Sequence, residues 1–280
     1  MSPIHDQGYR RYVGQRTPPG HAWSVIAKAG IRTLVSKRAF IGLLLLSWLP
    51  FVVRSVQIYA ATSLPQAAFL APDARMFRQF LEQQEVFLFF ITVYAGAGLI
   101  ATDRRANALQ IYLSKPLSRF EYIFGKLMIL STFLLFVTWV PAVLLLLIQI
   151  MFSGSFKFFL DNLFLFPAIT VFSFIQVIAV ASAMLALSSL SNSSRYVAVL
   201  YTGLIFFSQA LYGIVFGVTR DSRLGWISMP ANLNRIGDAI FNLPSRFQLS
   251  VVAASIAVVL LILVAGVILE KRVRGIEVVA

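Results

Sequence analysis

The sequence has no cysteine and only two histidines among its 280 residues. The missing cysteines exclude a disulfide framework and a thiolate metal site. Both histidines, His5 and His21, lie in the polar first 21 residues. A solvated tail is the simplest interpretation of that segment, and a ligand role is the alternative. We therefore predict no metal site in this chain.

Acidic side chains are also scarce, with 11 Asp and Glu residues, and we place none in the central part of an apolar run. Intramembrane proteases, lipid transferases and ion-coupled carriers need ionisable groups inside the bilayer, where such groups are costly and kept for function. The sequence also lacks the HExxH motif of zinc proteases and the GxxxxGK[ST] motif of P-loop ATP sites. We predict no catalytic residue and no cofactor in this chain, which would then be a membrane body without its own energy source.

Hydrophobic residues are abundant, at 59% of the chain, whereas charged residues make up 12%. Runs of about 20 apolar residues recur along the whole length, which is the length that crosses a bilayer as a helix. Lipid offers no hydrogen bonds to the backbone, so each such run must be helical. The predicted fold class is an all-α polytopic membrane protein with six spans, at about 39–61, 86–101, 123–152, 163–190, 196–218 and 249–269.

The predicted domain organisation is a polar cytosolic tail (1–21), an amphipathic interfacial helix (22–38), a transmembrane domain (39–270) and a second cytosolic tail (271–280). Apolar residues from Trp23 to Leu34 recur at i, i+3, i+4 and i+7, and Lys28 and Arg32 share another face. A basic amphipathic helix with tryptophan on its apolar side is typical of the headgroup plane. A plain extension of the first span is the alternative.

Two segments between spans carry further predictions. Residues 62–85 are expected to form an outer loop. Residues 219–248 are expected to contain a short helix that starts at Pro230 and lies on, or dips into, the outer membrane surface. Its apolar face would be formed by Leu233, Ile236, Ile240 and Phe241, with Arg235 and Asp238 on other faces.

Individual residues within the spans have two interpretations each. Pro50 predicts a kink in the first span. Arg54, in the outer third of that span, would extend toward the interface or act as a functional intramembrane charge. Gly213 and Gly217 form a GxxxG motif, which serves helix packing or self-association.

The distribution of basic residues sets the orientation. With the N-terminus inside, the cytosolic segments hold 16 Lys and Arg residues and the outer segments hold 7. This bias favours both termini in the cytosol of a multi-pass protein in the cytoplasmic (inner) membrane. We therefore attribute the net charge of +13 to basic residues that set the topology beside the membrane. Membrane lipid is an expected partner of the chain, and nucleic acid is not.

The longest well-structured polar segment is the central loop, residues 103–126, DRRANALQIYLSKPLSRFEYIFGK. Leu109, Tyr112 and Leu113 form a short apolar stripe that predicts one or two helical turns, which Pro116 ends. Ser118 and Glu121 have the spacing of a capping box, so a new helix is predicted to start at Ser118. The loop is therefore expected to consist of two short rigid pieces with a break between them.

This loop resembles that of ABC-2 type transporter permeases. In them a D-R-x-x-x-x-L segment leads to L-S-x-P-x-S-R, then E-Y and G-K, before the third span. The family often has Gly-Thr where this chain has Asn107-Ala108. The matching residues are Asp103, Arg104, Leu109, Leu113, Ser114, Pro116, Ser118, Arg119, Glu121, Tyr122, Gly125 and Lys126.

The resemblance implies a permease subunit of an exporter, paired with a second permease copy and driven by a separate cytosolic ABC ATPase that binds ATP and Mg²⁺. The residues it assigns to ATPase coupling are Asp103, Arg104, Arg105, Leu109, Tyr112, Leu113, Pro116 and Arg119. By the same analogy Thr92, Thr202, Ser208 and Gln209 line the transport path, with interhelical hydrogen bonding as the alternative.

Two other functions stay open. A membrane enzyme is disfavoured by the missing ionisable groups inside the predicted spans. A membrane scaffold or assembly factor would use the same loop to dock a soluble partner without transport.

Overall fold

The computed structural model describes residues 21–64, 66, 71–108, 117–153, 157–246 and 248–273. Within these ranges every regular element is a helix. Six helical segments are long and apolar enough to cross a membrane. The predicted all-α fold with six spans is therefore confirmed.

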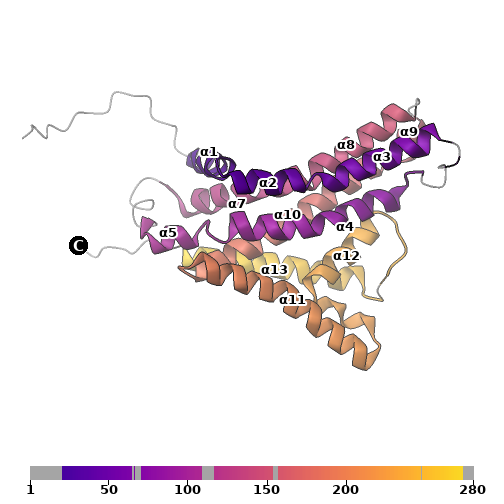
Figure 1. The fold of residues 1–280 in the computed structure, drawn as a ribbon. Helices are drawn as coiled ribbons and strands as arrows, with labels where there is room; N and C mark the ends of the chain where they lie inside the picture. The colour runs from indigo at the N-terminus through magenta and orange to yellow at the C-terminus, as the bar shows by residue number, and fades with distance from the viewer. Residues whose placement is uncertain are drawn as a thin grey trace, which may run out of the picture.

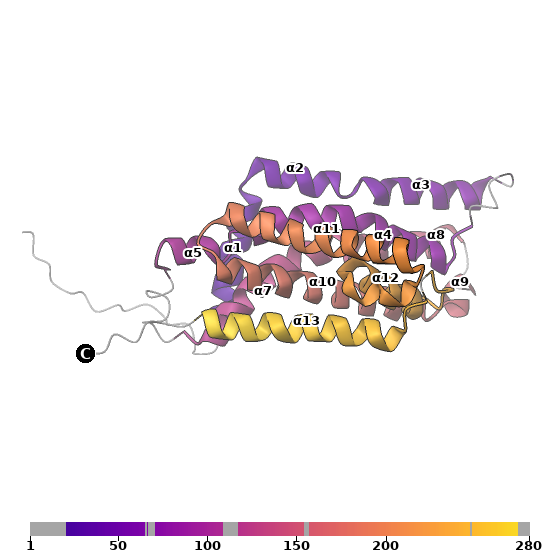
Figure 2. The ribbon, with the colours of Figure 1, turned by 90° about the horizontal axis from the view of Figure 1, so that it is seen from below.

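The bundle has two ends (Figure 1). We call the end that carries α5 (Ala101–Arg105) and the start of α7 (Arg119–Val137) the loop end, and the opposite end, with α12 (Met229–Ile240), the far end. α10 (Leu165–Leu190) is the most buried span. α11 (Ser194–Thr219) lies at the margin, and α13 (Val251–Arg272) packs on both α10 and α12. Figure 2 shows α13 and the paired helices α2 and α3 on opposite sides of the bundle.

The first and third spans are each broken once. The first consists of α2 (Arg38–Leu46) and α3 (Leu49–Ser63), and Pro50 lies in the first turn of α3, which accounts for the predicted kink. Gln84 Nε2 donates to the Ser47 carbonyl at this break, at 3.1 Å. The third span is α7 followed by α8 (Trp139–Phe152), with the break at Thr138.

The second span differs from its prediction, because α4 (Ala74–Ile91) begins twelve residues before residue 86. Asp73 caps this helix by accepting from the Met76 amide at 2.8 Å. The outer loop predicted for 62–85 is therefore wrong over residues 74–85. The first turns of α4 alternate charged with buried apolar residues, so a search for continuous apolar runs misses them.

The corrected boundary puts Glu82 and Glu85 inside the second candidate span, Ala74–Arg105. At about 1.5 Å per residue, Glu85 lies about 7 Å from the midpoint of that span. The predicted absence of acidic residues from the central parts of the spans is wrong at this position, and the argument against ion-coupled transport loses its support there.

α1 (Ala22–Val35) lies across the bundle and is seen almost end-on in Figure 1. Its apolar stripe packs on α7: Trp23 meets Phe124 edge to face at 5.1 Å, and Ala27 and Leu34 are buried. A Cβ on Gly30 would lie 2.2 Å from Ile129. The helix is separate from the first span, and the stripe predicted to face lipid contacts protein.

α12 starts at Met229, with Pro230 in its first turn, as predicted. Leu233, Ile236 and Phe241 are buried. The helix packs between α4, α10, α11 and α13, and Asp238 is only 1% exposed. Asp238 thus lies on a different face from the apolar stripe, as predicted, and that face meets charged residues of α4. The position of the helix on, or dipping into, the outer membrane surface stays a prediction.

The remaining helices are α9 (Lys157–Asp161), between the third and fourth spans, and the 3₁₀ helix η3 (Ser222–Ile227), between α11 and α12. Arg54, on α3, donates to Gln57 at 2.8 Å and to Gln83 at 3.3 Å. Its side chain thus bonds within α3 and across to α4.

Candidate functional site

Asp103, at the loop end, joins the two helices that border the central loop. Its Oδ2 accepts from the Tyr122 hydroxyl at 2.7 Å and lies 2.7 Å from Lys126 Nζ. Tyr122 is fully buried, and the side chains of Lys126 and Asp103 are 12% and 17% exposed. One carboxylate therefore ties α5, the end of the second span, to α7, the start of the third.

The predicted capping box is confirmed at the start of α7. The Ser118 hydroxyl accepts from the Glu121 amide at 3.1 Å, and Glu121 Oε2 accepts from the Ser118 amide at 3.0 Å. The other Glu121 oxygen accepts from the Ala22 amide at the start of α1, at 3.2 Å. Glu121 thus accepts hydrogen bonds at the starts of two helices, α1 and α7. We call these contacts of α1, α5 and α7 the loop-end joint.

The second span is interrupted just before the joint. A π-helical turn, η2 (Thr92–Gly96), follows α4, and a turn at 97–100 separates it from α5. The Ser188 hydroxyl of α10 accepts from the amides of Ile100 (3.1 Å) and Ala101 (3.0 Å) and donates to the Ala97 carbonyl (2.9 Å). One buried serine therefore satisfies three backbone groups that the interruption leaves without helical partners.

Replacing this serine tests its role in holding the interruption. Ser188→Ala leaves two amides and one carbonyl buried without partners, and we expect a loss of about 1–3 kcal/mol or more in unfolding free energy. The measurement is thermal or denaturant unfolding of the purified chain. Ser182→Ala is the matched control, because that hydroxyl bonds only within α10, to Ala179. Equal stability of the two variants would contradict the role of Ser188.

The residues assigned to ATPase coupling lie differently in the structure. Asp103 faces inward into the joint, Arg104 is half-buried, and Arg105 and Arg119 are exposed. Asn107 follows α5 with φ 52°, a left-handed conformation that glycine and asparagine adopt most readily. This conformation explains why asparagine can stand where the resembling family often has glycine. Leu109, Tyr112, Leu113 and Pro116 lie outside the described residues.

The four residues predicted to line a path lie on two elements, η2 and α11. Thr92 is fully buried in η2, and Thr202 is half-buried on α11. The Ser208 hydroxyl donates to the Ile205 carbonyl, and Gln209 Oε1 accepts from the Ser228 hydroxyl at 2.5 Å. The Gln209 bond fits the alternative of hydrogen bonding between elements, and the path-lining role of the four stays a prediction.

A cavity of about 490 Å³ adjoins the joint. α1 contributes Gly30 to its wall, the start of α2 contributes Lys37, the interrupted span contributes Tyr94, and α7 contributes Lys126. We call it the loop-end cavity. The cavity lies between α1 and the interruption in the second span.

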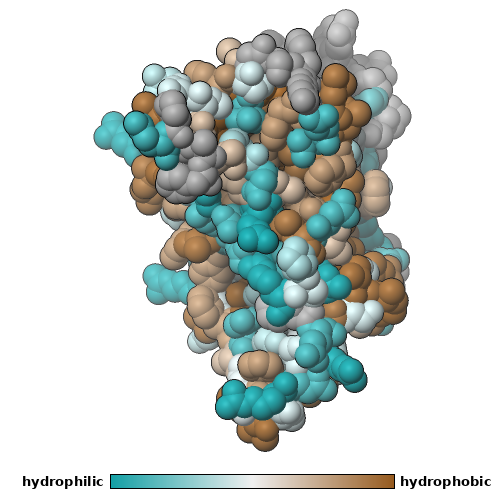
Figure 3. Space-filling model, turned by 90° about the vertical axis from the view of Figure 1, so that its right-hand side faces the viewer, coloured by the Kyte–Doolittle hydropathy of each residue, from teal (hydrophilic) through white to brown (hydrophobic). Residues whose placement is uncertain are grey.

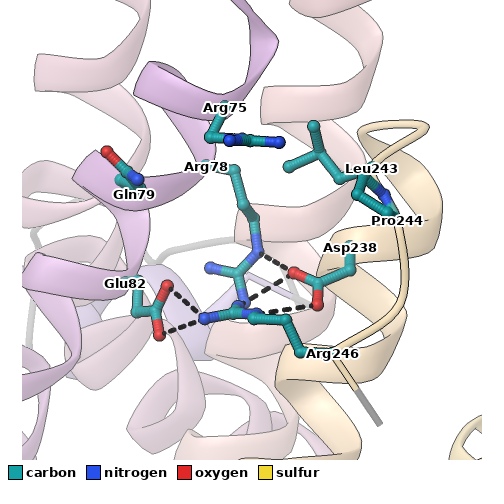
Figure 4. Close-up of a pocket in the computed structure, with 8 residues that line it drawn as sticks. All are labelled: Arg75, Arg78, Gln79, Glu82, Asp238, Leu243, Pro244 and Arg246. Atoms are coloured by element: carbon teal, nitrogen blue, oxygen red, sulfur yellow. Dashed lines mark hydrogen bonds and ion pairs between the residues drawn. The ribbon is translucent and has the colours of Figure 1, made fainter. Parts of the chain in front are cut away.

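A second polar site, at the far end, was missed by the sequence analysis (Figure 4). Arg78 of α4, 1% exposed, lies 3.4 Å from Asp238 of α12 and donates to Asn234 Oδ1 at 2.6 Å. Arg246 bonds both Asp238 and Glu82, and these hydrogen bonds raise its pKa, so it stays charged. Sequence signals for the site are weak, because its members come from segments more than 150 residues apart.

Comparison with known protein families identifies the family of this chain. A family model described as ABC-2 family transporter protein matches residues 24–227, which are 204 of the 280 residues and run from α1 to the end of η3. No curated protein matches the chain significantly. With more than half of its length matched and six candidate spans, the chain belongs to the ABC-2 family of transporter proteins, as a membrane permease of an ABC transporter.

Proposed function

We propose that this permease is an exporter subunit that a separate cytosolic ABC ATPase drives through residues 103–126. Both termini and the loop end would face the cytosol. ATP and Mg²⁺ would be bound by the ATPase, and the conformational change of the ATPase would reach the membrane through the loop-end joint. The observation that carries the proposal is Asp103, whose carboxylate bonds both Tyr122 and Lys126 at the start of the third span.

The two helices that leave the joint would respond differently to a force on the loop. α7 is continuous from its capping box to Val137, so it would move as one rigid piece. The second span is interrupted at 92–100 and would bend there, since π-helical turns and short breaks often mark functional hinges. The loop-end cavity leaves space beside the interruption for that bending. Such a joint converts a push at one end into a change in helix packing.

A second permease copy would complete the transporter by covering α11. The outward side chains of α11 include Tyr196 and Phe207, both 70% exposed, and Val218, 81% exposed. Gly213 and Gly217 have no atoms of other helices close to the Cβ position that a side chain would occupy. A GxxxG surface of this kind permits close approach of another helix, and a homodimer is the simplest partner arrangement.

Reversing the two basic charges that follow Asp103 tests the coupling assignment. In the variant Arg104→Glu/Arg105→Glu, we expect the ATPase recovered with the purified permease to fall about tenfold or more, because like charges would then meet across the contact. Membrane insertion should be unchanged. The measurement is co-purification with the cognate ATPase. In the same preparation, the mass of the intact complex gives the number of permease copies and so tests the proposed dimer.

The matched control reverses two exposed charges at the same end, in Lys28→Glu/Arg32→Glu on α1. This variant has the same net charge and should retain the ATPase. Full complex formation by the Arg104→Glu/Arg105→Glu variant would count against the coupling role of the loop. A scaffold without transport is the alternative, and a vesicle flux assay with the ATPase present would separate it from an exporter.

A further inference from the structure

The far-end site contains more cationic groups than its own carboxylates can occupy. It surrounds a pocket of about 340 Å³, into which three arginines and two carboxylates project. We propose that this pocket binds an oxyanion of the phosphate type, such as the headgroup of an anionic lipid or a free phosphate. The inference does not depend on which partner drives the permease.

The acceptor atoms of the pocket are already used. Arg246 Nη1 donates to both oxygens of Glu82, at 2.9 and 3.1 Å. The same guanidinium donates to both oxygens of Asp238, through Nη2 at 2.9 Å and Nε at 3.0 Å. Arg246 therefore binds Asp238 in a bidentate pair through two nitrogens and holds both Glu82 oxygens through the single nitrogen Nη1.

The donors left over belong to α4. Arg78 Nη1 is buried and has no hydrogen-bond partner among the described residues, although the guanidinium stacks on Phe172 at 4.8 Å. Arg75, one turn earlier, is exposed and makes no hydrogen bond or ion pair with another described residue. In Figure 4 both side chains lie over the pocket, across from Leu243 and Pro244. A buried cation with an unused donor is costly, so an anion entering the pocket would be stabilised.

The acidic groups near Arg78 attract its charge but give its Nη1 no hydrogen bond. The ion pair of Arg78 with a described residue is with Asp238, already bonded to Arg246. Glu85, two turns further along α4, also attracts the Arg78 charge, but its side chain lines a different and mainly apolar pocket beside Phe89 and Tyr201. The lining of the far-end pocket therefore keeps one positive charge in excess, with three arginines against Glu82 and Asp238.

The depth of the pocket favours a headgroup. The second candidate span has 32 residues, more than the about 20 that a helix needs to cross a hydrocarbon core about 30 Å thick. Arg75 and Arg78 lie in its first turns and thus at headgroup level, where lipid phosphates are found. Figure 3 looks onto the far end and shows hydrophilic side chains gathered in a band with hydrophobic surface beside it.

The test is a titration of the purified full-length chain in a neutral detergent at constant salt, followed by its thermal unfolding midpoint. The probes are short-chain phosphatidylglycerol, matched short-chain phosphatidylcholine and inorganic phosphate. We expect phosphatidylglycerol to raise the midpoint and phosphatidylcholine to leave it unchanged. If inorganic phosphate also raises the midpoint, the pocket recognises the phosphate group alone. If inorganic phosphate leaves the midpoint unchanged, the pocket recognises the lipid.

Substitutions of single arginines test whether the stabilising probe binds in the far-end pocket. Arg75→Gln keeps the buried cluster intact, and we expect it to raise the half-saturating concentration about tenfold, the loss of one charge-assisted hydrogen bond. Arg223→Gln, an exposed arginine that does not line the pocket, should bind as the parent does. Equal stabilisation by the two lipids, no stabilisation by any probe, or an unchanged titration of Arg75→Gln would each overturn the proposal.

Discussion

Asp238→Ala is expected to cost about 3–5 kcal/mol of unfolding free energy, the amount lost when one partner of a buried ion pair is removed. The carboxylate of Asp238 bonds Arg246 through both oxygens and lies 3.4 Å from the buried Arg78 guanidinium. Without it, Arg78 keeps the oxygens of Asn234, the ring of Phe172 and the attraction of Glu85, but it loses the carboxylate of its ion pair. Chemical denaturation of the purified chain measures the loss.

The double variant Arg78→Met/Asp238→Leu provides the internal control. It removes the buried cation together with the carboxylate of its ion pair, and Arg246 keeps its bonds to Glu82. We expect it to be more stable than Asp238→Ala, and the two sites to show a coupling energy on the order of 0.5–3 kcal/mol in a double-mutant cycle. If the losses of unfolding free energy from the two single substitutions simply add up in the double variant, Arg78 and Asp238 do not stabilise each other.

Asp103→Ala is expected to separate ATPase binding from transmission. The substitution leaves the Tyr122 hydroxyl and the Lys126 ammonium without their shared acceptor at the joint. Binding of the ATPase should persist, since exposed Arg105 and Arg119 are unchanged. Transmission should fall by about 5- to 150-fold, the range that coupling energies of about 1–3 kcal/mol produce.

A reporter on α7 measures this transmission. The chain has no cysteine, so Thr132→Cys, at an exposed position three turns beyond the joint, gives a single labelling site for a fluorophore. ATP should change its signal in the parent complex and much less in Asp103→Ala. Glu270→Ala removes an exposed acidic residue at the end of α13 and should respond as the parent does. An unaltered ATP response in Asp103→Ala would contradict the role of the joint.

Local and near-local signals determined much of this protein from its sequence. Apolar runs of bilayer length fix six helices because lipid satisfies no backbone group, and six spans are found. Pro50 lies at the break in the first span, and Ser118 and Glu121 form their capping box, because these effects act within one helical turn. The loop pattern around Asp103 and Arg104 likewise indicated the ABC-2 family, which the family match confirms.

Tertiary structure alone decided the features that bring distant segments together. The first turns of α4 are amphipathic rather than continuously apolar, so only packing against α12 reveals that Arg78 and Asp238 meet inside the bundle. Ser188 lies almost 90 residues from the amides that it binds, and Asp103 shows its partners only once α5 and α7 lie side by side. Hydrophobic periodicity reports whether a residue is buried, whereas the partner of a buried polar group depends on which helices become neighbours.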